Sequence, residues 1–172
     1  MTAGASLAAA PVTLFRIAAD TPAYGADDRT GAGAKKTGGR WNRPDTAVIY
    51  AAPSRALACL ETLVHVAPAG AWPFNRYLVE VIVPYASWMS RTIFNPASHV
   101  GWDALPAGLV SLDWGTSWAR DMTALIAEVP SVIVPEEPNY LLNPMHPDMK
   151  AVTVRKVRRW TYDPRLPTST AP

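Results

Sequence analysis

Residues 38–66 read GGRWNRPDTAVIYAAPSRALACLETLVHV, and they predict a loop, a strand and a helix in direct succession. The two glycines permit positive φ angles and a close approach of another group to the backbone. The apolar run TAVIYAA is typical of a short strand. Pro53 and Ser54 then begin a helix, with Ser54 as its N-cap. At 100° per residue, Leu57, Leu60 and Val64 share its main apolar face. Because apolar residues surround most of this helix, we expect it to be covered on more than one side.

The other segments predict more strands than helices. We expect strands at VTLFRIA (12–18), RYLVEVIVP (76–84), SVIVP (131–135) and AVTVRKVRRWTY (151–162), and a second helix at SWARDMTALIAEV (117–129), with Thr116 or Ser117 as its cap. Irregular segments are expected at 20–39, 87–114 and 136–148, with Trp88, Trp102 and Trp114 as packing anchors. This mixed order predicts an α+β or mixed α/β fold, with a compact sheet flanked by helices.

The bulk properties of the chain indicate one ordinary globular domain. It has 172 residues, of which 49% are hydrophobic and 17% charged, and its net charge of +2 is too small to imply nucleic-acid binding. The single cysteine, Cys59, fits a reducing compartment. No apolar run reaches the roughly 18 residues of a membrane span, and the N-terminus lacks the basic start of a signal peptide. These features predict a cytoplasmic protein without a membrane partner.

Arg40 is the first candidate for a binding residue. A guanidinium group presents a planar fork that suits phosphate oxygens, and the two preceding glycines would let a ligand approach. The alternative is a β-turn that carries an exposed arginine. A strand follows this stretch rather than a helix, so the motif does not predict a Rossmann dinucleotide site.

Three further residues have two interpretations each. Tyr50 ends an apolar strand, where its ring could stack on a planar ligand or simply pack in the core. Glu61 lies at the margin of an apolar helix face, so its carboxylate is either paired with a cation such as Arg40 or Arg16, or kept for chemistry. Ser131 could point its hydroxyl into a cleft or merely cap a turn.

Other common chemistries find no support in the sequence. His65, His99 and His146 are scattered, without the spacing of a zinc site, and no G-x-S-x-G elbow marks a hydrolase. Cys59 lies among apolar residues and is expected to pack rather than react. The basic run VRKVRRW (154–160) is interpreted as a solvated edge strand, with RNA or an acidic partner as the alternative.

Several quoted pieces, in this order, resemble the RES-domain toxins of RES–Xre toxin–antitoxin pairs. They are LFR, GGRWN, VIYAAPSRALACLETLVH, PSVIVPEEPNYLLNP followed by HP, and DPRL. The resemblance implies a RES domain at 13–165, between a flexible N-terminus (1–12) and a flexible tail (166–172). It assigns the arginine, glutamate and serine of the family name to Arg40, Glu61 and Ser131.

The resemblance also implies a function. It suggests a fold related to ADP-ribosyltransferases, a site that uses NAD+ as its substrate with no permanently bound cofactor and no metal, and an Xre-like antitoxin that covers the active site. Arg16 is a second candidate arginine, Tyr50 a pocket residue, and Asn143 a residue that lines the pocket or fixes a loop. The broadly apolar helix is also compatible with a homodimer. Direct nucleic-acid binding is not expected.

The reaction expected from these residues is cleavage of the nicotinamide–ribose bond. Nicotinamide leaves as a neutral molecule, so one carboxylate suffices to offset the charge of an oxocarbenium-like transition state. Glu61 would hold the ribose, Arg40 with Arg16 the pyrophosphate, Tyr50 the nicotinamide, and Ser131 the amide or the ribose. The acceptor stays open between water, phosphate and a protein. A non-enzymatic module that binds RNA or a partner is the alternative of another class.

Overall fold

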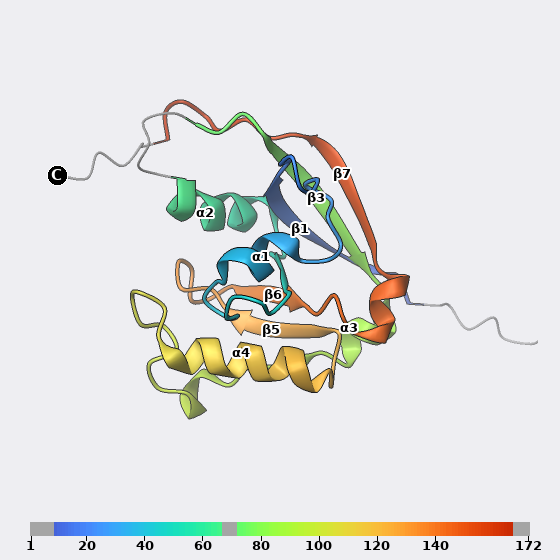
Figure 1. Cartoon of the computed structure of the whole chain (residues 1–172), viewed down its shortest axis with the longest axis vertical. Coiled ribbons are helices and arrows are strands. Elements are labelled where there is room, and N and C mark those ends of the chain that lie inside the picture. The colour runs from blue at the N-terminus through green and yellow to red at the C-terminus, as the bar shows by residue number, and fades with distance from the viewer. Residues whose placement is uncertain (1–8, 67–71, 167–172) are drawn as a thin grey trace, which may run out of the picture.

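The computed structural model describes residues 9–66 and 72–166, and it arranges them as two β-sheets with helices around them (Figure 1). The strands are β1 (Val12–Ala19), β2 (Ile49–Ala51), β3 (Arg76–Val83), β4 (Thr92–Ile93), β5 (Ile126–Pro130), β6 (Pro138–Leu142) and β7 (Thr153–Arg159). The helices are α1 (Ala32–Thr37), α2 (Arg55–Val66), α3 (Tyr85–Met89) and α4 (Leu109–Asp121), with 3-10 helices at Pro96–Ser98 and Pro147–Ala151. The mixed α+β class is confirmed, with two sheets in place of one.

The expected flexible ends fall largely on residues that the structure does not describe. Residues 1–8 and 167–172 lie outside the described residues. Val12, which was placed in the N-terminal segment, is the first residue of β1. None of the helices within 9–66 and 72–166 is long and apolar enough to cross a membrane.

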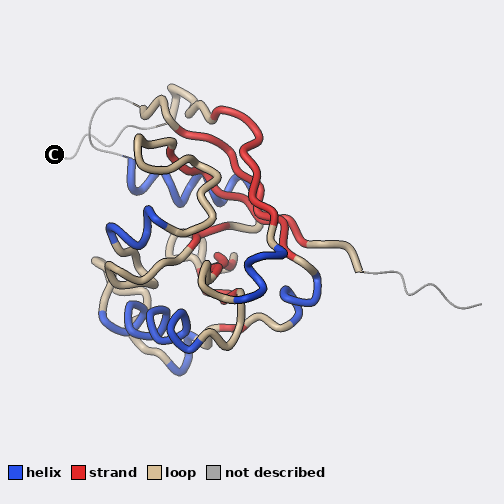
Figure 2. The backbone as a smooth tube through the Cα atoms, turned by 45° about the vertical axis from the view of Figure 1, so that its right-hand side comes forward, coloured by secondary structure: helices blue, strands red, loops and turns tan. Residues whose placement is uncertain are grey.

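The two sheets meet along one edge. The first has the order β1-β3-β7 and is antiparallel throughout, whereas the second has the order β2-β6-β5-β4, with β4 parallel to β5. Phe15 of β1 and Ala52, just after β2, exchange two backbone hydrogen bonds of 2.8 and 2.7 Å. In the turned view of Figure 2 the long strands of the first sheet run side by side, apart from the short strands of the second.

The main core fills the space between the sheets. Buried residues from both sheets form it, including Leu14, Val81, Val83, Ile49, Ile126 and Leu142. A second cluster lies on the other face of the second sheet, where Trp118 and Ala119 of α4 pack against Ala127, Val129 and Leu141. Strands β5 and β6 are therefore covered on both faces, which explains why the neighbouring residues Ile126 and Ala127, and Leu141 and Leu142, are all apolar.

Helix α2 packs with a different face from the one expected. Ser54 is its cap, as predicted, because its Oγ accepts the backbone N–H of Leu57 at 3.1 Å. Leu57 is buried, but Leu60 and Val64 are 40% and 57% exposed. The expected face of these three residues is therefore not the face that packs within this chain, and cover of the other side by another molecule stays a prediction. A helix that is apolar around most of its circumference does not reveal which side its neighbours cover.

The segments around residue 120 were assigned to the wrong elements. Helix α4 begins after Gly108 rather than near Ser117, so neither expected cap is used. It ends at Asp121, and its C-cap Met122 has a left-handed φ of 48°. The stretch after it forms β5, SVIVP is a loop, and β6 lies within the expected loop 136–148. Short apolar runs do not distinguish a strand from a helix by periodicity, and the pairing of β5 with β6 decides here.

The two other expected loops also contain regular elements. Helix α1 lies within 20–39, and α3, β4 and the start of α4 fall at least partly within 87–114. The packing role of the three tryptophans is confirmed. Trp88 packs against Tyr140 with ring centroids 4.8 Å apart, while Trp102 and Trp114 pack against Trp41 at 6.1 and 5.7 Å.

Strand β7 is an edge strand, as predicted, but its cations serve the fold. Arg155 pairs with Glu80 and Lys156 with Asp20, each at 2.7 Å. Arg158 lies over the ring of Trp160, and Arg159 donates to the carbonyl of Phe74. A bulge in the pairing with β3 interrupts the alternation of a regular strand. Arg155, opposite Glu80, and Arg158, opposite Leu78, therefore lie on the same side of the sheet.

Candidate functional site

Glu61 lies in a cluster with two residues that are distant in the sequence. Helix α2 directs its half-buried carboxylate toward the loop after β5 and toward β6. The hydroxyl of Ser131 donates to Glu61 Oε1 at 2.7 Å across a separation of 70 residues. The side-chain amide of Asn139 donates to the same oxygen. The structure thus brings together the glutamate and serine that the sequence singled out, and it adds an asparagine.

The Ser131 hydroxyl is fixed in its role as a donor to Glu61. Ser131 is fully buried, and its Oγ accepts the backbone N–H groups of Ile133 and Val134, both at 3.1 Å. A hydroxyl has two acceptor lone pairs and one proton. With both lone pairs used by the turn, the proton is left for the carboxylate. Ser131 therefore caps its turn and orients Glu61 at the same time.

The carboxylate of Glu61 forms no ion pair with the described residues. Within the described residues, neither Arg40 nor Arg16 forms a salt bridge with it, and its Oε2 receives no hydrogen bond. A half-buried carboxylate without a cation is costly unless a ligand or solvent reaches it. The expected pairing with Arg40 or Arg16 is therefore not formed among the described residues, and a chemical role of Glu61 stays a prediction.

Arg40 lies on the loop between α1 and β2. Gly38 has a φ of 71°, so the expected positive φ is confirmed at this position. A Cβ on Gly39 would lie 2.7 Å from the Tyr50 hydroxyl, so the loop can run this close to Tyr50 only without a side chain. Arg40 Nη1 donates to the carbonyls of Trp102 and Ala104 at 3.1 and 2.9 Å. These two bonds hold one end of the guanidinium group, and the described residues leave Nη2 and Nε for a ligand.

Tyr50 connects this loop to the second sheet. Its hydroxyl accepts the backbone N–H of Trp41 at 3.0 Å and donates to Asn42 Oδ1 at 2.6 Å. Asn42 is fully buried, and its amide nitrogen donates to the carbonyls of Ala34 and Thr46, both at 2.9 Å. Burial raises the pKa of Tyr50 well above its usual value, against a smaller opposite effect of the Arg40 charge. The phenol therefore stays protonated at any physiological pH.

Removal of this hydroxyl should loosen the loop. We expect Tyr50→Phe to lower stability by about 1–3 kcal/mol, because the Trp41 N–H and Asn42 Oδ1 lose their partner. Thermal unfolding measures the loss. A Tyr85→Phe protein, changed at an exposed phenol on α3, is the control. Equal melting temperatures for Tyr50→Phe and the parent would mean that the hydroxyl does not hold the loop.

The loop and the carboxylate cluster meet on one face of the second sheet. Tyr50 is the direct cross-strand partner of Leu141, and Asn139 lies two residues before Leu141 on β6. Side chains two residues apart on a strand point to the same face, as do direct cross-strand partners. Tyr50, beside the Arg40 loop, and Asn139, bonded to Glu61, therefore share a face. The arginine and the glutamate are approached from the same side of this sheet.

Arg16 is the second arginine of interest. It lies on β1 opposite Val79, and its Nη1 is buried without a hydrogen-bond partner among the described residues. Burial lowers the pKa of Arg16, while the charge of Asp28 and the neighbouring Tyr24 act in the opposite direction. A buried donor without an acceptor is rare and suggests that an acceptor is supplied from outside the chain. Arg16 therefore stays a candidate beside Arg40.

Asn143 forms hydrogen bonds that stabilise the fold. It is 1% exposed, its amide donates to the carbonyl of Ala119 at 2.8 Å, and its Oδ1 accepts the backbone N–H of Met145 at 3.0 Å. These contacts tie the end of β6 to α4. Of its two expected roles, loop fixation matches this geometry, and a contact with the substrate stays a prediction.

Two residues of the site were missed in the sequence. Asn139 fell in a segment that was expected as a loop, and Asn42 drew no attention beside Arg40. A signal for Asn139 was available, because PNYLL places an asparagine and a leucine at alternate positions of a strand. The fully buried Asn42 has no comparable signal, since only the folded loop brings its acceptor to Tyr50.

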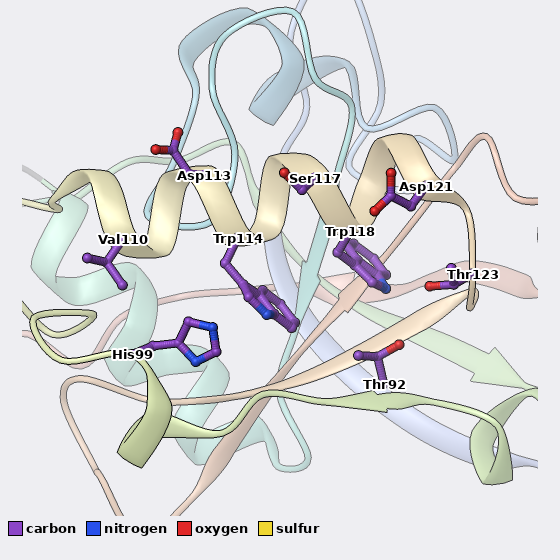
Figure 3. A pocket seen from close by; sticks show the side chains of 9 residues that line it. All are labelled: Thr92, His99, Val110, Asp113, Trp114, Ser117, Trp118, Asp121 and Thr123. Atoms are coloured by element: carbon purple, nitrogen blue, oxygen red, sulfur yellow. The ribbon is translucent and has the colours of Figure 1, made fainter.

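A shallow hollow elsewhere on the surface has a different lining. It measures about 570 Å³ and lies between α4 and the segment before it, where Thr92, His99, Val110, Asp113, Trp114, Ser117, Trp118, Asp121 and Thr123 line it (Figure 3). None of the candidate catalytic and substrate-binding residues, Arg16, Arg40, Tyr50, Glu61, Ser131 and Asn143, lines it. Within the described residues, no three His, Cys, Asp or Glu side chains are grouped so that they could hold a metal ion.

Comparison with known proteins gives consistent matches over most of the chain. A family model described as RES domain matches residues 13–165. The "Prs ADP-ribosylating toxin" of Sphingobium sp. (strain YBL2) is 55% identical over 155 residues, which cover 90% of this chain and 96% of that protein. Two proteins named "Toxin Res" are each 35% identical: that of Yersinia enterocolitica covers 83% of this chain and 93% of its own length, and that of Pseudomonas putida 81% and 92%.

Proposed function

This chain belongs to the RES domain family, whose toxins have an ADP-ribosyltransferase-like fold, and from this premise we propose that it is a toxin that cleaves the nicotinamide–ribose bond of NAD+. The observation that carries the proposal is the Glu61 carboxylate. It is held by two donors on one oxygen, carries no ion pair within the described residues, and lies on the same side of the second sheet as the Arg40 loop.

The chemistry follows from the charge that develops on the ribose. As the bond between C1′ and nicotinamide breaks, its electron pair leaves with the neutral nicotinamide, and positive charge builds on the ribose ring. A fixed carboxylate stabilises that charge without the cost of reorganising at the moment of reaction. Glu61 would do this through Oε2, the oxygen that receives no hydrogen bond from the described residues. An acceptor then attacks C1′ and gives up its proton.

The other residues take supporting roles in this proposal. Arg40 would bind the pyrophosphate through its free guanidinium nitrogens, and Arg16 offers a second, buried cation. Tyr50 fixes the Arg40 loop with its hydroxyl, its ring packs against the second core cluster, and a contact of that ring with the nicotinamide stays a prediction. Ser131 was expected to touch the amide or the ribose. Because its hydroxyl is committed to Glu61, we assign it the orientation of that carboxylate instead.

The proposed cleavage can belong to either of two reactions, which differ in the acceptor of the ADP-ribose group. The sequence favoured degradation of NAD+ by water or phosphate, whereas the name of the 55% identical relative favours transfer of ADP-ribose to a protein. Incubation of a cell lysate with NAD+ labelled on its adenosine part separates the two. A labelled protein band means transfer, and free ADP-ribose or its phosphate means degradation. If the label stays in NAD+, the chain does not have the proposed activity.

Arg40 should act mainly on substrate binding. We expect Arg40→Ala to raise KM for NAD+ about 10-fold or more with kcat changed far less, because a pyrophosphate contact is made in the ground state as well as in the transition state. Arg43→Ala is the matched control, since that exposed arginine pairs with Asp113. Steady-state kinetics with purified protein measure KM and kcat for each variant. A fall in kcat without a change in KM would move Arg40 from binding to catalysis.

The proposed partner is an antitoxin encoded beside the toxin, of the Xre-like kind that the family resemblance implies, and the proposed place of action is the cytoplasm. The prediction is a fall in cellular NAD+ after induction of the chain alone and protection by the neighbouring gene. The RNA-binding alternative loses its main support, because the cations of β7 have partners within the fold. Thermal-shift titration with NAD+ and with RNA separates these functions.

A further inference from the structure

We propose that Asn139 is a positioning residue for Glu61, equal in importance to Ser131 in holding the carboxylate for the reaction. The inference rests on the proposed function, since it concerns the same site. It goes beyond the proposed function by adding Asn139, a residue to which the sequence assigned no role. It also states which carboxylate oxygen faces the substrate.

The contact between Asn139 and Glu61 joins two separate parts of the fold. Glu61 projects from α2, which packs on the first sheet, and Asn139 projects from β6 of the second sheet. The Asn139 backbone is held at its place in the strand opposite Val129 of β5. A strand fixes the direction of its side chains, so the amide is aimed by the sheet rather than by a loop. The hydrogen bond from Asn139 thus sets the position of α2's carboxylate against the second sheet.

The two donors leave one oxygen of Glu61 for the substrate. Ser131 and Asn139 both donate to Oε1, and no described residue donates to Oε2. Hydrogen bonds to a charged group are stronger than those between neutral groups, so the pair fixes the rotation of the carboxylate. With the plane fixed, Oε2 keeps one direction, and no described residue competes with a substrate for it. Loss of either donor would let the carboxylate turn and would place its charge wrongly for the developing cation.

The test compares two substitutions at the same position. We expect Asn139→Ala to lower kcat for NAD+ consumption about 10- to 100-fold, the scale of one hydrogen bond to a charged group, with KM within about threefold. Asn139→Asp keeps the size of the side chain but replaces the donor by a second carboxylate beside Glu61. It should be at least as slow as Asn139→Ala near neutral pH.

Acidification separates a donor role from a packing role. Two carboxylates that share a site hold one proton more tightly than either does alone. As the pH is lowered from about 8 to about 5.5, the Asn139→Asp protein should bind that proton and regain a donor toward Glu61. The ratio of the parental kcat to the kcat of Asn139→Asp should then fall, whereas the same ratio for Asn139→Ala should stay constant. Asn75→Ala removes a surface amide that donates to the Asp20 carbonyl, and it should match the parent throughout.

Either of two kinetic results would overturn the inference. One is an Asn139→Asp protein with the parental kcat, which would mean that only the shape of the side chain matters. The other is an Asn139→Ala protein that changes KM alone or nothing. Thermal unfolding of each variant shows that the comparison is made on folded protein.

A second measurement does not depend on the reaction. In the NMR spectrum of the parent, the side-chain amide protons of Asn139 should be widely separated in chemical shift, because only one of them faces the carboxylate. Glu61→Ala removes the acceptor of the Asn139 hydrogen bond and should narrow that separation. If the parent consumes no NAD+ with any acceptor, the proposed function fails, and this spectrum still decides the inference. Unchanged amide signals in Glu61→Ala would refute it.

Discussion

The Glu61→Gln protein is expected to fold like the parent and to consume NAD+ about 100- to 1,000-fold more slowly, the scale of one preorganised electrostatic contact. The amide oxygen of glutamine can still accept the hydrogen bonds of Ser131 and Asn139, so the cluster should keep its shape. The substitution removes only the negative charge that the developing cation needs. The effect should therefore appear in kcat, with little change in KM.

The measurement is the loss of NAD+ over time with purified protein, beside the thermal unfolding of each variant. Glu136→Gln is the control, because it removes an exposed carboxylate from the loop just after Ser131. It should match the parent. A Glu61→Gln protein that consumes NAD+ at the parental rate would show that Glu61 has no electrostatic role.

The second large effect concerns stability and lies at Gly115, in the middle of α4. A Cβ at this position would lie 2.0 Å from the carbonyl oxygen of Trp41 and 2.8 Å from its carbonyl carbon. These are backbone atoms that cannot turn away as a side chain can. The neighbouring Thr116 also holds this loop, because its Oγ1 accepts the backbone N–H of Arg43 at 3.1 Å. The helix and the Arg40 loop touch directly, backbone against backbone.

Gly115→Ala should therefore force α4 and the loop apart. Overpacking of a core typically costs about 1–3 kcal/mol and occasionally more, and a clash with backbone atoms belongs at the upper end. For a chain of this size that means a fall in Tm of roughly 10 °C. Ser117→Ala, an exposed change on the same helix, should stay within about 0.5 kcal/mol of the parent. An unchanged Tm for Gly115→Ala would mean that α4 does not pack on this loop as closely as described.

Parts of the fold with a strong local signal were predictable from the sequence. Strands β1, β3 and β7 lie close to the expected ranges, because each is a long run bounded by clear breaks. Helix α2 and its Ser54 cap were also predictable from local chemistry. The face of α2 was not, since Leu57, Leu60 and Val64 are equally apolar and only the position of the first sheet decides which is buried.

Most of the second sheet could not be predicted from the sequence. Its strands are two to five residues long, and β5 follows α4 so closely that the apolar run was assigned to the helix. IAEVP is a strand because it pairs with PNYLL. The local sequence pattern does not reveal this pairing. The same limit hid Asn139, whose importance depends on the strand that presents it.

The candidate site was likewise predictable only in part. Glu61 was noted at the margin of an apolar helix face, the family resemblance paired it with Ser131, and the fold places the two in contact. The sequence could not show that the Ser131 hydroxyl is saturated, because its two backbone partners come from a turn that forms only after β5. Nor could it show that Arg40 is held by the carbonyls of Trp102 and Ala104, more than sixty residues away.

The central claim is that Glu61 and Arg40 serve a single NAD+ site, and a crystal structure of the Glu61→Gln protein with NAD+ tests it most directly. The account predicts that the nicotinamide ribose lies within hydrogen-bond distance of residue 61 and that the pyrophosphate contacts Arg40. NAD+ bound instead in the hollow beside α4, with residue 61 and Arg40 both free of it, would contradict the account.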